Sequence, residues 1–194
     1  MVNFLALLGW NPGTDQEVFS MEELIKQFNI KKIQKSGAIF NTEKLDWINS
    51  LYIKKMDTEK LAELCAPYTI NFKAQNEKLK KIIEIKKERM NKLSDISEDI
   101  DYFFAQPEYK KEKLLWRGEK DLNKTKKHLE MILELAGDEK AIRDYAEKEG
   151  RGNVLWPFRM ALSGRDKSPD PFAISNALGV EETRKRIRYA IGKI

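Results

Sequence analysis

The sequence predicts an all-α fold built from short helices. Apolar residues recur along the chain at steps of three and four, which is the spacing of one face of an α-helix. No segment shows sustained alternation of apolar and polar residues, so we expect almost no sheet. Apolar residues make up 41% of the 194 residues and charged residues make up 35%. This balance is typical of a globular chain rather than of a disordered one.

The first predicted helices are short. Residues 4–8 form an apolar helical segment that ends at Gly9. The last of the four short helices in this part ends before Pro67. Ser20 begins the second helix, because Glu23 follows three residues later and completes a capping box. The side chains that can cap the third and fourth helices are Asn41 or Thr42, and Asp57 or Thr58.

The second half of the chain carries clearer apolar stripes. The longest predicted helix begins near Asn71 or Asn76 and ends at Leu93. Residues 154–162 are predicted to be helical. Within them, Pro157 is a candidate for the first turn of the helix, because proline fits that position. The other predicted segments are a helix closed by Gly137, a helix begun by Asp138, a loop at 164–171 and a final helix at 180–191.

The residues that usually build catalytic or metal sites are scarce. The chain has one cysteine and one histidine. Cys65 lies in an apolar helical pattern, so we expect a core thiol and no disulfide, in a reducing cytoplasm. His128 lies off the centre of its helix's apolar stripe and is expected to face solvent. No spacing suits zinc, and no glycine-rich loop suits a nucleotide, so we expect no metal or cofactor site.

The ends and surface of the chain indicate neither a membrane protein nor a secreted one. No apolar run approaches the ~18 residues of a membrane helix. The N-terminus lacks the basic region and cleavage site of a secretion signal. It opens directly on apolar residues, which indicates that Met1 begins inside a larger protein.

Basic residues gather in two stretches of a chain whose net charge is +5. Lysines and arginines outnumber acids between Lys73 and Lys92, and again between residues 184 and 193. This excess fits a phosphate-bearing partner, although lysines on a helix also serve simply to solvate it.

Two arginines are candidates for contacts with RNA bases. Arg89 falls at the edge of its apolar stripe, where a planar guanidinium can reach a base edge or stack on a ring. Arg159 points away from the buried face of its helix, and the loop that follows brings Ser168 near a helix start. RNA-binding proteins commonly hold unpaired bases on such groups. An ordinary helix–loop–helix with exposed charges remains the alternative.

Three motifs resemble, in order, the C-terminal region of the glutamyl-tRNA synthetase family. They are NFLALLGW at residues 3–10, FNTEKLDWIN at residues 40–49 and PFRMALSG at residues 157–164. The resemblance covers essentially the whole chain. A loose match to the Lys-Met-Ser-Lys-Ser loop, KIQKS at residues 32–36, follows the Gly-Trp element rather than preceding it, so we attribute it to chance.

The resemblance implies a class I ligase that uses ATP and Mg²⁺ to join glutamate to its tRNA. It implies that this chain lacks the catalytic domain and is inactive alone. The expected architecture is the end of a stem-contact domain at 1–53, then two helical anticodon-binding subdomains at 54–108 and 109–194. The expected partner is tRNA(Glu), bound by a monomer. A helical protein–protein adaptor that shares the fold is the alternative function.

The resemblance also assigns roles to residues of the anticodon-binding part. Arg89 matches an arginine that reads the third anticodon base and favours glutamate over glutamine tRNA. Arg159 matches an arginine that contacts the first anticodon base. Ser168 stands where a threonine often sits and keeps its hydroxyl. Pro171 stands where a leucine can pack on bases, and it lacks that branched side chain.

Three more residues are expected to meet the tRNA stem or its phosphates. Trp47 belongs to the domain that meets the inner elbow of the tRNA, although a buried core position is the other interpretation. Lys86 and Lys92 are expected to contact phosphates.

Overall fold

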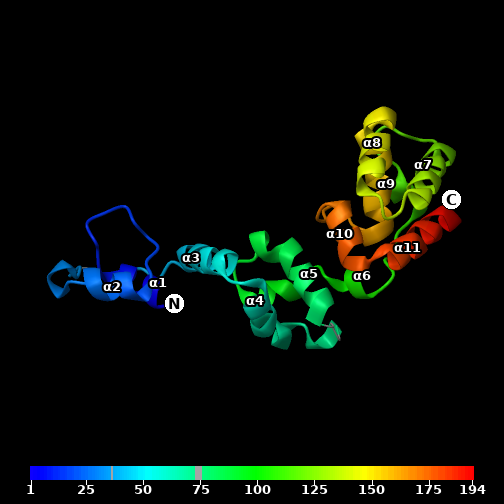
Figure 1. Cartoon of the computed structure of the whole chain (residues 1–194). Coiled ribbons are helices and arrows are strands. Elements are labelled where there is room, and N and C mark those ends of the chain that lie inside the picture. Colours follow the sequence, from blue (N-terminus) through cyan, green and yellow to red (C-terminus); the bar gives the residue numbers. More distant parts are fainter. Residues whose placement is uncertain (36, 73–75) are drawn as a thin grey trace.

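The computed structural model describes residues 1–35, 37–72 and 76–194, and within them the protein is all-α, as predicted. The described residues form no strand, and a single β-bridge joins Trp10 to Ile33. The helices follow one another in an elongated row from the N-terminus to the C-terminal group (Figure 1). Ser36 of the KIQKS segment and Lys73 of the basic stretch lie outside the described residues.

The N-terminal third has its own small core. Trp10, Phe19 and Leu24 form an apolar cluster here, and Ser20 makes the predicted capping box with Glu23. Asn41, one of the two expected caps, accepts the backbone N–H of Lys44 and begins the third helix. The helices of this part are α1 (Val2–Gly9), α2 (Met21–Gln27), the 3₁₀ turn η1 (Ile30–Lys32) and α3 (Thr42–Lys55).

The middle third packs short helices around buried aliphatic side chains. Asp57 caps α4, and Cys65 is fully buried, so both predictions are confirmed. The elements are α4 (Thr58–Cys65), η2 (Ala66–Tyr68), η3 (Ile70–Phe72), α5 (Asn76–Lys86), η4 (Lys87–Arg89), η5 (Leu93–Ser97) and α6 (Asp101–Phe104).

The predicted end of α5 at Leu93 is wrong, because the helix stops at Lys86 and continues only as the 3₁₀ turn η4. A carboxylate keeps the helix from continuing to Leu93. Asp95 Oδ2 accepts the backbone N–H groups of Asn91 (2.9 Å) and Lys92 (3.0 Å), which therefore leave the helical pattern.

The C-terminal part is a compact helical group (Figure 1). Its elements are η6 (Lys111–Leu114), α7 (Leu122–Glu134), α8 (Glu139–Glu149), α9 (Arg151–Ser163), α10 (Pro171–Leu178) and α11 (Val180–Lys193). Pro157 lies inside α9 and does not begin it, contrary to the prediction. Pro157 and Phe158 are both buried, so packing holds the helix together where local preference would end it.

The prediction that His128 faces solvent is also wrong. Its side chain is 4% exposed, and its Nδ1 lies 2.8 Å from the hydroxyl of Tyr145 on α8. Thr125, Leu129 and Ile132 are buried on the same face, at the steps that place His128 among them. Burial lowers the pKa of His128 below its ordinary value, so the neutral imidazole is favoured.

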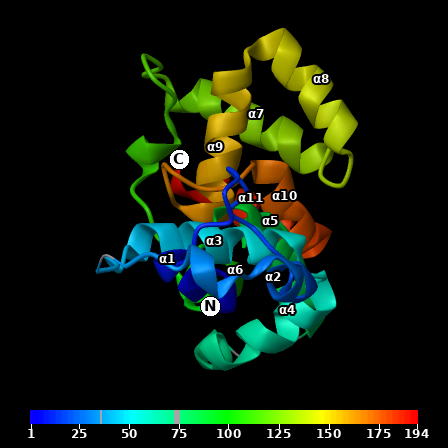
Figure 2. The ribbon, with the colours of Figure 1, turned by 90° about the vertical axis from the view of Figure 1, so that its left-hand side faces the viewer.

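One apolar core continues through the middle and C-terminal parts, from Ile53 to Ala190. Arg186 of α11 lies inside it with a side chain that is 1% exposed. Its guanidinium donates to the carbonyls of Tyr102 (2.5 Å), Leu162 (2.6 Å) and Ala105 (3.1 Å). It thereby joins α11 to α9 and to the connection around α6, and it helps to set how the two parts meet. Viewed along the row, α1, α2 and α3 lie in front of the rest (Figure 2). None of the helices in the described ranges has the length and apolar character needed to cross a membrane.

Candidate nucleic-acid interface

A cavity of about 400 Å³ opens where the middle part meets the C-terminal group. We call it the central cavity. Its walls are the end of α5 with the segment that follows it, one residue of α3, and the loop between α9 and α10. The lining residues are Asp46, Ile85, Lys86, Arg89, Met90, Asn91, Lys92, Asp95, Glu98, Asp99, Tyr102, Lys167, Ser168 and Pro169.

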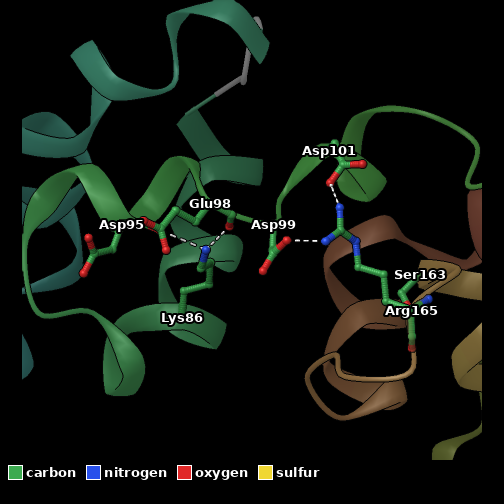
Figure 3. Close-up of polar contacts among 7 residues, drawn as sticks. All are labelled: Lys86, Asp95, Glu98, Asp99, Asp101, Ser163 and Arg165. Carbon is green, nitrogen blue, oxygen red and sulfur yellow. Dashed lines mark hydrogen bonds and ion pairs between the residues drawn. The ribbon is translucent and has the colours of Figure 1, made fainter.

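The first wall is shaped by Lys86, whose ammonium group points back at the backbone. Lys86 Nζ donates to the carbonyl of Asp95 (2.9 Å) and to that of Glu98 (Figure 3). These carbonyls belong to the turn that ends η5, so Lys86 holds the turn against α5. Burial of the ammonium lowers the pKa of Lys86 from its ordinary value.

The second wall is the loop at residues 164–170, whose backbone is hydrogen-bonded to Arg159. Arg159 Nη1 donates to the carbonyls of Ser168 and Pro169 (3.0 Å to the latter) and lies 3.2 Å from the Ser168 hydroxyl oxygen. Asp170 then caps α10 by accepting the N–H of Phe172 at 2.9 Å. The arginine on α9 therefore fixes the backbone that lines the cavity.

Arg165 clamps the two walls together. Its guanidinium donates to Asp99 through Nη1 and to Asp101 through Nη2, the latter at 2.6 Å (Figure 3). Asp99 has a left-handed backbone with φ of 53°, which aspartate tolerates better than most residues. Burial raises the pKa of the neighbouring Tyr102 to about 12, so this phenol stays protonated at neutral pH.

The cavity offers both donors and acceptors. Arg89, Lys92 and Lys167 are exposed and make no side-chain ion pair or hydrogen bond with the residues that the structure describes. The carboxylates of Asp46 and Glu98 are likewise unpaired there. A mixed set of this kind suits the edge of a nucleobase, which carries donors and acceptors together, better than it suits a bare phosphate.

The structure brings four of the predicted residues together. Lys86, Arg89, Lys92 and Ser168 all line the central cavity. Arg159 reaches the same loop from its far side and touches Ser168.

Pro171 and Trp47 do not line the cavity. Pro171 is buried in the first turn of α10. The Trp47 side chain is 43% exposed on α3, so the interpretation of Trp47 as a buried core residue is wrong.

Sequence reasoning missed Arg165, Tyr102 and the acidic residues of the cavity. A signal for the clamp was present, because residues 95–101 hold four acids and Arg165 follows the PFRMALSG motif directly. Spacing alone does not show that these two segments meet. In the described part of the chain, no group of three or more histidine, cysteine, aspartate or glutamate side chains is arranged to hold a metal ion.

With this geometry in place, comparison with known proteins assigns the class of the fold. The family model described as "Anticodon binding domain" matches residues 60–191, which include the whole second wall and most of the first. A model of "tRNA synthetases class I (E and Q), catalytic domain" matches residues 1–47. The chain belongs to the anticodon-binding domain family.

The individual relatives are glutamate–tRNA ligases. The Porphyromonas gingivalis enzyme is 40% identical over 98% of this chain, and the Clostridium kluyveri enzyme is 38% identical over all of it. A crystal structure of a glutamate tRNA ligase from Elizabethkingia meningosepticum in complex with its amino acid superposes with a TM-score of 0.83. It shares 32% identity over 98% of this chain. The resemblance found in the motifs is confirmed.

The chain spans about two fifths of the length of these relatives. It covers 42% of the Clostridium protein, 40% of the Porphyromonas protein and 40% of the Elizabethkingia chain.

Proposed function

We propose that this chain is the tRNA-binding C-terminal part of a glutamate–tRNA ligase, and that the central cavity takes an unpaired base of the anticodon loop of tRNA(Glu). The observation that carries the proposal is Arg89. It is exposed at the cavity wall with no partner among the described residues, beside acceptors and donors that match a base edge. An unpartnered guanidinium leaves all five of its N–H donors free for a base.

The residues of the cavity take different parts in the proposed docking. Arg89 reads the third anticodon base directly. Lys92, with Lys167 opposite it, attracts the phosphates that flank the base. Lys86 acts indirectly, because its ammonium is already engaged on two carbonyls of the wall.

The residues around the α9–α10 loop act through the backbone. Arg159 positions the loop that carries Ser168, and the first anticodon base meets that loop. Pro171 supports the same loop from the buried first turn of α10. The exposed ring of Trp47 on α3 faces the tRNA stem, in the part proposed to end a stem-contact domain near residue 53.

The longer protein would join glutamate to tRNA(Glu) with ATP and Mg²⁺ in the cytoplasm, as a monomer. We place ATP, Mg²⁺ and glutamate on the part of the relatives that this chain does not span, so the chain alone supplies tRNA binding and anticodon discrimination. The proposed boundary between the two anticodon-binding subdomains lies near residue 108. A helical protein–protein adaptor is not favoured, because the hollow that it would use is charged and because the relatives are ligases.

Salt dependence tests the proposal. If the chain neutralises three loop phosphates, the affinity for tRNA(Glu) falls about 20-fold between 50 and 200 mM salt, because released counterions oppose binding. Fluorescence anisotropy of a labelled tRNA(Glu) transcript over a salt series measures this slope. A blunt RNA duplex without an unpaired loop serves as the control and should bind more weakly. Absence of tRNA binding, or an affinity independent of salt, would contradict the proposal.

A further inference from the structure

A second hollow lies beside the same loop. Its volume is about 490 Å³, and it is lined by residues of α9, by Asp166 and by Trp116. We call it the tryptophan hollow. Trp116 comes from the segment between η6 and α7, and Trp156 comes from α9. Their ring centroids lie 5.2 Å apart with the planes inclined at 53°.

The two indoles are held in place before any ligand arrives. Trp156 Nε1 donates to the carbonyl of Lys113 at 2.9 Å, which ties α9 to η6. Trp116 rests directly on the backbone of α9 at Gly152. A Cβ on Gly152 would overlap Trp116 Nε1 and stand 2.5 Å from its Cε2, so only glycine permits this approach. The pair therefore forms a fixed aromatic platform rather than two mobile side chains.

The segment that carries Trp116 is strongly basic. Residues 110–127 contain eight lysines and arginines, and three acids. Arg117 lies over the Trp116 ring at 5.6 Å from the centroid, and within the described residues it forms no ion pair. Basic residues interleaved with a stacking aromatic ring are what proteins use to hold single-stranded nucleic acid, whereas protein–protein interfaces are depleted in lysine, which supplies most of the charge of this segment.

The hollow is also joined to the central cavity. Arg159 lines the tryptophan hollow, while its guanidinium holds Ser168, which lines the cavity. Residues of one loop, seven residues long at 164–170, thus line both hollows: Asp166 the tryptophan hollow, and Lys167, Ser168 and Pro169 the central cavity.

We propose that the tryptophan hollow binds an unpaired nucleotide of the same RNA, with its base stacked on Trp116 and its phosphate drawn to Arg117. This inference rests on the proposed function, since the nucleotide is a neighbour of the one in the central cavity. The platform recognises the flat face of a base, so it adds affinity with little preference for which base it holds.

The test measures tRNA(Glu) binding by Trp116→Ala, Trp116→Phe and Gly152→Ala. Trp116→Ala is expected to weaken binding about 5- to 150-fold, the range for the loss of one stacked base. Trp116→Phe keeps a ring and should retain most of the affinity. Gly152→Ala should weaken binding by pushing the indole off α9. Its matched control is Gly192→Ala, a helical glycine with open space around it, which should bind as the wild type does.

A second readout keeps the result independent of folding. tRNA(Glu) carrying 2-aminopurine at single loop positions should lose fluorescence on wild-type protein at one position, and that quenching should be absent with Trp116→Ala. If the wild type binds tRNA while Trp116→Ala binds equally well and quenches equally, the tryptophan hollow is not a nucleotide site, and the proposed function stands. If the wild type does not bind tRNA, the proposed function and the assignment of the tryptophan hollow as a nucleotide site are both contradicted.

Discussion

Replacing Arg186 with methionine is expected to lower the free energy of unfolding by about 3–5 kcal/mol, as when one partner of a buried charged network is removed. The guanidinium is 1% exposed and satisfies the carbonyls of Tyr102, Leu162 and Ala105. It also pairs with Glu182 at 2.9 Å. Methionine fills similar space but leaves these buried acceptors without donors.

Urea denaturation followed by circular dichroism measures the loss. Arg188→Met is the matched control, because Arg188 lies two residues away on α11 and is exposed. Its effect should stay within about 0.5 kcal/mol. Equal effects of the two substitutions would show that Arg186 does not hold the middle part to the C-terminal group.

Gly164→Ala is expected to destabilise the protein by about 2–5 kcal/mol, the sum of a left-handed backbone cost and a clash. Gly164 ends α9 with φ of 66°. A Cβ there would lie 2.9 Å from the Cβ of Pro107 and 3.3 Å from Cδ1 of Tyr109. Because Arg165 follows directly, relief of the clash would also move the clamp and the loop that lines the central cavity.

Gly118→Ala separates the two causes. Gly118 has φ of 83° as the third residue of the turn in which the Glu119 N–H donates to the Trp116 carbonyl, and its Cβ would meet open space. Gly118→Ala should therefore lose only the backbone cost of about 1–2 kcal/mol. The free energy of unfolding of both variants is measured by urea denaturation. If Gly164→Ala costs no more than Gly118→Ala, the close approach to Pro107 does not contribute to the loss of stability.

The sequence predicted well the helix starts that depend on local chemistry. Ser20, Asn41, Asp57 and Asp138 each accept a backbone N–H within three residues, and such contacts follow from residue type alone. The end of α5 was mispredicted because Asp95, nine residues beyond Lys86, competes for the N–H groups that would continue the helix.

The remaining mispredictions arise from tertiary packing, which the sequence pattern does not show. Pro157 stays inside α9 because its neighbours are buried. His128 is buried because its Nδ1 has a hydrogen-bond partner in the hydroxyl of Tyr145 on another helix. Arg186 stands three residues after Thr183 and one before Ile187, so its place on the buried face was readable from spacing. Its charge argued against burial, and the carbonyls of α9 and of the segment around α6, together with the Glu182 carboxylate, resolve that conflict.

The sequence identified several residues of the central cavity, but it did not predict that they line one cavity. The helical pattern, the loop at 164–171 and the family resemblance singled out Arg89 and Ser168, which are 79 positions apart, and the fold brings both to one cavity. The Arg165 clamp and the contact of Trp116 with Gly152 join segments far apart in the sequence. No pattern within either segment predicts the other.

The central claim is that Arg89 reads a base in the central cavity, and the most direct test combines a protein change with an RNA change. Wild-type protein should prefer tRNA(Glu) over the same tRNA altered at the third anticodon base by about 1–3 kcal/mol. Arg89→Gln should lose most of that preference, while Arg188→Gln, on the exposed face of α11, should keep it. Anisotropy titrations of the two tRNAs with the three proteins give all six affinities. An unchanged preference in Arg89→Gln would contradict the account.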